Sequence, residues 1–286
     1  MPEKLTLLDY DVAPKDFHPL GIEYHEPSQT LFVVNHAEVG TRIECFQLSV
    51  EEGSAKHRRT IVHPQLPTPN SLAALNATSF LVSNDHRYRQ RDSRLWATFE
   101  TYLGLPSATL VRVDLGDGAD EAVMVTLLAR QAFPNGVALL NRTTIAVASS
   151  PRALVYLYTS PSGFTAGADD VSHTGTIHLS FIPDNLSVDK AGALLIAGHP
   201  HAPSLEAVVH RNAYCNTPGA KKIDCPNAPS WIAEWTPDGG LRDLYVGENF
   251  STATTAVRDV QRGFGLAVGL YDRGILTWKE AEAESL

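Results

Sequence analysis

One short phrase occurs four times in this chain of 286 residues, and it constrains the fold more than any other feature. Each copy starts at a proline, runs through three further residues and leads, after a short gap, into a strongly apolar stretch. The copies begin at Pro19, Pro69, Pro134 and Pro183, and their apolar stretches are 31–36, 80–85, 145–149 and 194–199. Each copy predicts a short strand, a turn and a second, more apolar strand. Repeats of this size in an all-β chain are typical of a β-propeller.

The second residues of these phrases predict a metal site. Equivalent positions of successive blades converge on the axis of a propeller, and they carry Asn70, Asn135 and the pair Asp184 and Asn185. Amide and carboxylate oxygens are the ligands that Ca²⁺ prefers, and it takes six to eight of them. The alternative for any one of these residues is that it caps a turn. Their recurrence at equivalent positions favours a Ca²⁺ site.

The composition is that of a folded chain with no nucleic-acid partner. Hydrophobic residues make up 43% and charged residues 19%, and the net charge is -9. Nucleic-acid-binding proteins usually carry a basic patch instead. No apolar stretch has the length of a membrane span, and the first residues lack the pattern of a signal peptide. We expect a cytoplasmic protein as the chain stands, or a secreted one if further residues precede Met1.

The repeats predict a single propeller domain over residues 1–286. Only one strand precedes the first phrase, so we expect the first blade to be incomplete. One insertion carries apolar residues at three-to-four-residue spacing between Leu95 and Leu103, which predicts a short amphipathic helix that ends at Gly104. Residues 209–229 are expected to form a loop.

The three cysteines have different roles. Cys45 lies in a strand-like stretch and is expected to be a small core residue. Cys215 and Cys225 flank a loop. They form a local disulfide in an oxidising compartment, or stay free thiols in the cytosol.

Several motifs, in order along the chain, resemble the paraoxonase/arylesterase family. They are Phe17-His18-Pro19-Leu20-Gly21-Ile22, Val33-Val34-Asn35-His36, Asn84-Asp85-His86, Tyr102-Leu103-Gly104-Leu105, Pro134-Asn135-Gly136, Asp184-Asn185-Leu186-Ser187-Val188-Asp189 and Gly198-His199-Pro200. The resemblance runs from about residue 5 to 280. It implies a six-bladed propeller with central Ca²⁺ ions, and an enzyme that hydrolyses lactones and aryl esters, with such a small molecule as its substrate.

The resemblance also assigns roles to individual residues. It makes Asn70, Asn135, Asp184 and Asn185 ligands of the catalytic Ca²⁺. His36 matches one histidine of the family's proposed dyad. Leu20 stands where the family has the other histidine, and His18, two residues earlier, is the candidate partner, because residues i and i+2 of a strand face the same side. The substrate pocket is expected to include Leu20, Asp85, His86 and His199.

Two further departures concern the metal. The family's calcium-binding glutamate and the aspartate beside it lie in an N-terminal segment that this sequence does not contain. Ser71 stands where the family has an aspartate of its structural calcium site.

The resemblance implies that Ca²⁺ polarises the substrate carbonyl and that a histidine activates water. Two alternatives stay open. One is a propeller that binds a small molecule or a partner without hydrolysis. The other is a metal-free enzyme of strictosidine-synthase type, for which Glu23 and Glu44 are the candidate bases.

Overall fold

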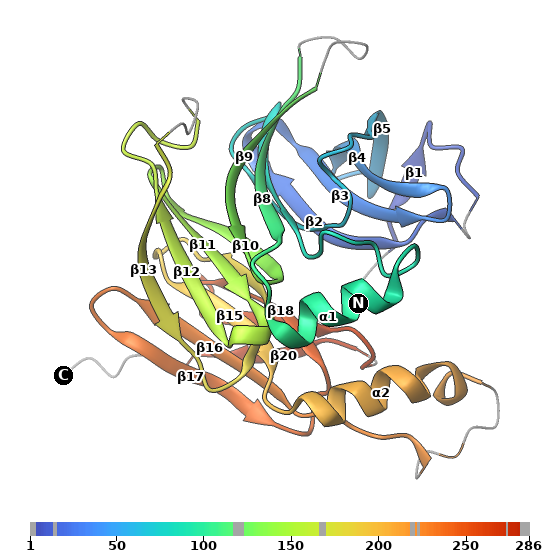
Figure 1. The fold of residues 1–286 in the computed structure, drawn as a ribbon, viewed down its shortest axis with the longest axis vertical. Coiled ribbons are helices and arrows are strands. Elements are labelled where there is room, and N and C mark those ends of the chain that lie inside the picture. The colour runs from blue at the N-terminus through green and yellow to red at the C-terminus, as the bar shows by residue number, and fades with distance from the viewer. Residues whose placement is uncertain are drawn as a thin grey trace. The chain divides into compact units, whose positions relative to one another are not determined.

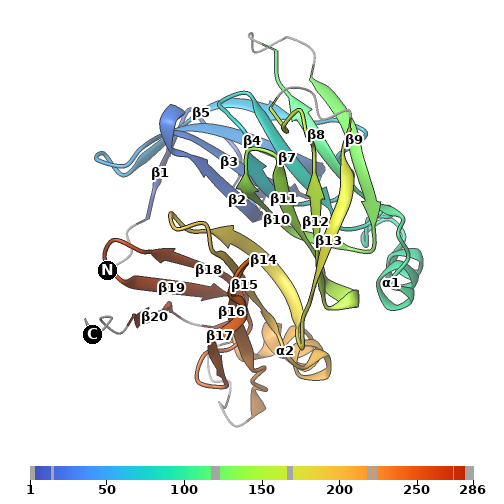
Figure 2. The ribbon, with the colours of Figure 1, turned by 90° about the vertical axis from the view of Figure 1, so that its left-hand side faces the viewer.

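The computed structural model describes residues 4–13, 16–116, 123–165, 170–217, 221, 224–272 and 274–280. Its regular structure is almost entirely antiparallel β-sheet. The chain divides into two compact units, the first made of Met1–Val137 and Thr159–Ser172, the second of Ala138–Tyr158 and His173–Leu286. Within each sheet the strands lie side by side, mostly in chain order (Figures 1 and 2).

The first unit holds two sheets and one α-helix. The strand orders are β1-β5-β4-β3-β2 and β6-β7-β8-β9. The strands are β1 (Thr6–Leu8), β2 (Pro19–His25), β3 (Thr30–Ala37), β4 (Gly40–Ser49), β5 (Ser54–Ile61), β6 (Pro69–Ala74), β7 (Ser79–Asn84), β8 (Ala108–Asp114) and β9 (Met124–Gln131). Helix α1 (Arg94–Leu103) connects β7 to β8. Strand β2 packs beside β6, as the innermost strands of neighbouring propeller blades do.

The second unit holds the sheets β14-β15-β16-β17 and β18-β19-β20 and most of the sheet β10-β11-β12-β13. The strands are β10 (Pro134–Asn141), β11 (Thr144–Ser149), β12 (Leu154–Thr159), β13 (Ser172–His178), β14 (Ile182–Val188), β15 (Leu194–His199), β16 (Ser230–Thr236), β17 (Gly240–Gly247), β18 (Ala253–Asp259), β19 (Phe264–Gly269) and β20 (Leu276–Lys279). Helix α2 (Ala202–Cys215) follows β15, and β14 packs beside β18.

The prediction of an all-β propeller is confirmed, but its blade count was wrong. The described residues form five sheets, not six. Six was the number that the family resemblance implied, whereas the four repeats and the segment 253–279 form five sheets. The prediction that the first blade is incomplete was also wrong. Strand β1 pairs in parallel with β5 and gives the first sheet five strands, while the last sheet has three. The single domain over residues 1–286 stays a prediction.

The predicted helical insertion is α1, which ends at Gly104 in the left-handed conformation with φ of 57°. A second helix, α2, forms where a loop was expected. Only Val208 of α2 is buried, so the helix lacks the apolar stripe that periodicity detects. Cys215 at its end forms a disulfide with Cys225. In the part of the chain that the structure describes, no helix has the length and apolar character needed to span a membrane.

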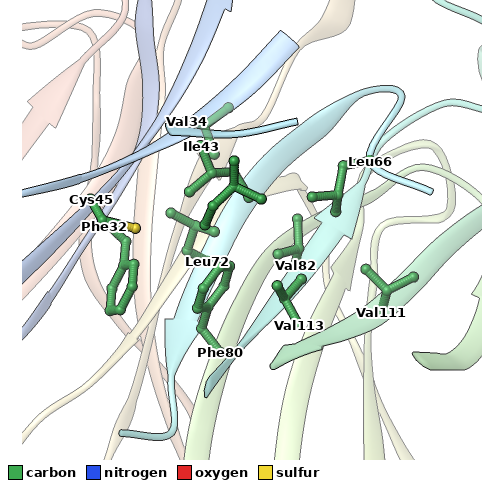
Figure 3. Close-up of a cluster of buried hydrophobic side chains, with 11 residues drawn as sticks. Phe32, Val34, Ile43, Cys45, Leu66, Leu72, Phe80, Val82, Val111 and Val113 are labelled. Carbon is green, nitrogen blue, oxygen red and sulfur yellow. The ribbon is translucent and has the colours of Figure 1, made fainter. Parts of the chain in front are cut away.

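The hydrophobic cores contain strands that are covered on both faces. All six residues of β7 and all six of β15 are buried, which explains why their central residues, 80–82 and 194–197, are apolar on both faces and do not alternate. Figure 3 shows the cluster between the two sheets of the first unit, where Phe32 and Phe80 lie 4.7 Å apart between ring centroids. Cys45 belongs to this cluster as a free, buried thiol, as predicted.

The predicted strand, turn and second strand are present, and in three of its four copies the repeated phrase itself carries a β-bulge. Register shifts occur at Pro19/Ile22 in β2, Pro69/Ser71 in β6 and Pro183/Leu186 in β14. A further shift at Ala253/Thr255 places a bulge at the same point of β18, where the sequence shows no proline. A bulge re-aims the side chain of its extra residue. Asn70, Asp184 and Asn185 are the bulged residues of their strands.

Gly21 leaves room for a close approach between β2 and β6. A Cβ atom at this position would lie 2.1 Å from the backbone oxygen of Asn70. The bulges of β2 and β6 therefore touch through their backbones, and any side chain at Gly21 would push Asn70 out of place.

A buried arginine ties the sheets of the second unit together. Arg258 of β18 contacts Asp189 at 2.5 Å, Glu234 at 2.6 Å and Glu280 at 2.5 Å. The side chain of Arg258 is 6% exposed and that of Asp189 is 0% exposed. Because each buried charge faces an opposite one, removal of the arginine would leave Asp189 as an unpaired buried carboxylate.

Candidate functional site

A cavity of about 250 Å³ in the first unit gathers three of the predicted site residues, His36, Asp85 and His86. They come from the end of β3 and from the segment just after β7. The other lining residues are Ala37, Thr41, Pro67, Thr68, Arg89, Gln90 and Arg91.

The hydrogen bond of His36 fixes which of its nitrogens is basic. Its Nε2 lies 2.7 Å from the backbone oxygen of Pro69. A carbonyl oxygen only accepts, so Nε2 carries the proton, and in the neutral ring the lone pair is on Nδ1. His36 therefore has the form that a general base needs, with Nδ1 as the atom that takes up a proton.

His86 has a different role, because both of its nitrogens are engaged. Nδ1 donates to Asp85 at 2.9 Å, and Nε2 lies 2.8 Å from the hydroxyl of Thr101 in α1. The other oxygen of Asp85 accepts from the amide of Asn70 at 3.1 Å. Hydrogen bonds between side chains thus connect helix α1 to the bulge of β6. They make His86 and Asp85 positioning residues that orient Asn70.

Phe133 supports this arrangement from the other side. Its ring meets that of His86 edge-on, with centroids 4.7 Å apart. The residue has φ of 40°, a left-handed conformation that costs a bulky residue about 1–3 kcal/mol and tends to persist at functional sites. It immediately precedes Pro134 and Asn135, the third copy of the repeated phrase.

The backbone of Asn135 is hydrogen-bonded to the sheet β6-β7-β8-β9. The hydroxyl of Ser83 in β7 donates to the Asn135 carbonyl at 2.5 Å and accepts from the backbone amide of Ser71 at 3.0 Å. The residue is 7% exposed. The first unit therefore places the segments that carry Asn70 and Asn135 next to each other.

Two further predicted ligands lie in the second unit with His199. The Nε2 of His199 donates to Asp184 at 3.1 Å, so the lone pair of a neutral ring is on Nδ1. This Nδ1 is buried and has no hydrogen-bond partner within the described part of the chain. Asn185 donates to the hydroxyl of Thr255 in β18 at 3.1 Å. Asp184, Asn185 and His199 thus form one polar group at the bulge of β14.

These residues fit a hard cation in part. The carboxylate of Asp85 can only accept, so the amide nitrogen of Asn70 must face it, which leaves the amide oxygen of Asn70 on the other side. In the second unit, Asp184 provides a carboxylate. Within residues 4–280, leaving out those that the structure does not describe, no three His, Cys, Asp or Glu side chains cluster as metal ligands. Within the first unit a cation would rely on asparagine oxygens, and the Ca²⁺ site stays a prediction.

His18 and Leu20 are both exposed. His18 precedes β2, and its carbonyl accepts from the backbone amide of His36 at 3.0 Å. Leu20 lies in the bulge of β2, and 42% of its surface is exposed. Neither residue lines the cavity of His36. Their predicted roles as dyad partner and pocket residue stay predictions.

The two glutamates proposed for a metal-free mechanism differ. Glu44 is 0% exposed and is bonded by Tyr10 at 3.0 Å, His57 at 3.0 Å and Thr60 at 2.5 Å. Glu23 accepts from the backbone amide of Ala74 at 3.2 Å. Burial raises the pKa of Glu23 to about 7, and only the Ala74 hydrogen bond opposes this shift. Glu23 is therefore the glutamate that can exchange a proton near neutral pH.

A larger cavity of about 660 Å³ also lies in the first unit. Its lining is mostly apolar and runs from Lys4 through Tyr10 and Phe17 to Phe46. It contains no histidine and no carboxylate. The smaller cavity has the acid-base groups and is the stronger candidate despite its size.

Sequence reasoning missed the basic segment of the site. Arg87, Arg89, Arg91 and Arg94 fall within eight residues of a chain whose net charge is negative. Two of them, Arg89 and Arg91, line the cavity of His36. Thr101 was missed as well, because nothing in its sequence context marks it as the partner of His86.

The protein-family model described as Arylesterase matches residues 9–218 of this chain. The chain belongs to the arylesterase family. Every site residue predicted above lies within the matched segment, from His18 to His199.

Curated relatives agree with this membership. The chain is 28% identical over 203 residues to serum paraoxonase/arylesterase 1 of Mus musculus, a match that covers 69% of this chain and 53% of that protein. It is 26% identical over 232 residues to serum paraoxonase/arylesterase 2 of Canis lupus familiaris, covering 74% and 60%. The arylesterase chain described here thus spans between half and two thirds of the length of these relatives.

Solved structures share the fold at low sequence identity. A protein from Lactobacillus plantarum has a TM-score of 0.51 and 14% identity, with 92% of this chain and 81% of that chain covered. Hydrazine synthase of Kuenenia stuttgartiensis has a TM-score of 0.51 and 12% identity, covering 91% and 57%. Such likenesses concern the fold alone, because one fold carries many chemistries.

Proposed function

We propose that this arylesterase-family chain is a hydrolase of lactones or aryl esters, and that His36 is its general base. The observation that carries the proposal is the proton arrangement of His36. In a chain of this family, its basic Nδ1 occurs on a ring that lines a cavity with oriented Asp85 and His86. This arrangement supports the activation of water by His36.

The reaction would proceed by addition of water to the carbonyl carbon. His36 would take one proton of the water on Nδ1 as the new C–O bond forms. The tetrahedral intermediate would then expel the alkoxide of the ester or lactone, and the imidazolium of His36 would return the proton to it. The products are a carboxylic acid and an alcohol, joined in one molecule when the substrate is a lactone. His86 and Asp85 would act only through the orientation of Asn70.

A Ca²⁺ ion is part of the proposal. Asn70, Asn135, Asp184 and Asn185 are the candidate ligands, and bound Ca²⁺ would supply charge stabilisation for the developing oxyanion. Three of these residues occupy β-bulges, and Asp184 is the one carboxylate among them. We expect the affinity to be weaker than that of sites with several carboxylates. Isothermal titration of the protein and of Asp184→Asn with Ca²⁺ measures this directly, and equal binding by both would exclude Asp184 as a ligand.

Turnover of phenyl acetate and of neutral γ- and δ-lactones by the whole chain tests the hydrolase. The informative variant is His36→Gln, whose amide keeps a donor for the Pro69 carbonyl but has no basic nitrogen. We expect at least a hundredfold loss of kcat, because general-base catalysis typically contributes 10²–10⁴-fold. The matched control is His173→Gln, an exposed histidine bonded to Thr176, which should keep full activity. Equal activity of His36→Gln would refute the role of His36.

The metal-free alternative has one observation in its favour, the raised pKa of Glu23. A base near neutral pH on β2 suits an enzyme that joins an amine to an aldehyde. Activity on such a pair that persists in EDTA and disappears in Glu23→Gln would support this alternative and contradict the calcium hydrolase.

A further inference from the structure

The cavity of His36 carries more positive charge than its surroundings. Arg89 and Arg91 line it, and Asp85 is the one carboxylate among its lining residues. Both oxygens of Asp85 are already engaged, one by His86 and one by Asn70. The chain as a whole has a net charge of -9. The positive charge at this cavity therefore contrasts with the negative net charge of the chain.

The two guanidinium groups are only partly engaged by the protein. Arg91 donates to the backbone oxygen of Glu38 at 2.8 Å, a contact that orients the group without neutralising it. Arg89 lies 3.5 Å from Asp92, whose side chain is 61% exposed. At that distance, and in solvent, the pair is weak. Each guanidinium has five N–H donors in a planar fork, so most of their donor capacity is left for a ligand.

The size of the cavity limits what enters it. About 250 Å³ is below the range of about 300–1,000 Å³ in which whole drug-sized ligands bind. The cavity suits one end of a substrate, such as a planar carboxylate or a phosphate with a few attached carbons. These are the groups that an arginine fork binds through two parallel hydrogen bonds.

We infer that Arg89 and Arg91 bind an anionic group of the substrate, a carboxylate or phosphate that is separate from the carbonyl under attack. This rests on the proposed function, because His36 lines the same cavity and would activate the water that attacks the neighbouring ester. The preferred substrates are thus anionic lactones or aryl esters, and the uncharged ones are poorer.

Paired substrates test the inference. Phenyl acetate is compared with 4-acetoxybenzoate and with 4-acetoxyphenyl phosphate, which differ from it only by the anionic group. The variants are Arg89→Gln, Arg91→Gln and their combination. The control is Arg94→Gln, an exposed residue at the start of α1 that does not line the cavity. We expect each cavity variant to raise KM for the anionic esters by about tenfold, the equivalent of one charge-assisted contact. Neither kcat nor the turnover of phenyl acetate should change.

A binding measurement separates the two proposals. 4-Hydroxybenzoate and inorganic phosphate are titrated against the protein and the double variant by calorimetry, without any reaction. If phenyl acetate is hydrolysed but neither anionic ester is preferred, the inference is overturned and the hydrolase stands. If no ester is hydrolysed but the anions bind and the double variant loses that binding, the anion site stands and the hydrolase falls. Equal or absent binding in both proteins would overturn the anion site.

Discussion

Substitution of Glu23 by glutamine should stabilise the protein at alkaline pH and have little effect at acid pH. Burial raises the pKa of this carboxyl group from its ordinary value of 4.5 to about 7. The folded state therefore holds a proton that the unfolded state releases between these two values. By linkage, the free energy of unfolding falls as the pH rises through that window and is level above it. A difference of about 2.5 pKa units corresponds to about 3 kcal/mol at pH 8 and to about 1 kcal/mol at pH 5.

The glutamine side chain keeps the acceptor for the Ala74 amide and removes the charge. Urea unfolding of the wild type and of Glu23→Gln at pH 5, 6, 7 and 8 measures the difference. We expect the gain in stability to grow from about 1 to about 3 kcal/mol across this series. Glu51→Gln, in the exposed turn between β4 and β5, is the control and should show no pH-dependent gain. A gain for Glu23→Gln that is the same at all four pH values would refute the reasoning.

Three other substitutions probe the fold. Gly21→Ala places a Cβ atom 2.1 Å from the Asn70 backbone oxygen. It should lower the free energy of unfolding by about 1–3 kcal/mol and reduce Ca²⁺ binding. The control Gly175→Ala, whose Cβ meets only the Leu157 side chain at 3.3 Å, should do neither. Arg258→Gln leaves Asp189 unpaired and should cost about 3–5 kcal/mol in urea unfolding, so a loss below 1 kcal/mol would show that the ion pairs contribute little. Cys225→Ser opens the disulfide to Cys215 and should lower stability by about 2–3 kcal/mol without changing turnover; an unchanged melting temperature would show that the loop it closes unfolds separately.

The repeats predicted the strands well because their signal is local. A proline and an apolar run recur in four of the five sheets, and the burial of β7 and β15 on both faces follows directly from their composition. The bulges themselves were not predicted, because one extra residue in a strand leaves no distinct pattern in the composition. The number of blades was taken from the family resemblance and not from the repeats. The pairing of β1 with β5 across nearly fifty residues, which adds a fifth strand to the first sheet, has no local signal in the sequence.

The candidate site was predictable in its residue types but not in its roles. The Asp85-His86 pair stood out in the sequence, yet its function depends on Thr101, which lies fifteen residues away and reaches His86 only because α1 folds back. The proton on Nε2 of His36 depends on the Pro69 carbonyl, a contact between two sheets. Arg89 and Arg91 were overlooked because their importance comes from the cavity that they line, which no local pattern reveals.

The most direct test of the calcium-hydrolase account is turnover of phenyl acetate and a panel of γ- and δ-lactones by this chain, with Ca²⁺ present and after EDTA treatment. The measurement includes Asn135→Ala, with circular dichroism and melting to show that each protein is folded. We predict turnover with Ca²⁺ that disappears in EDTA, returns when Ca²⁺ is restored and is lost in the variant. A folded protein that turns over none of these substrates with Ca²⁺ would contradict the account, as would turnover that EDTA leaves unchanged.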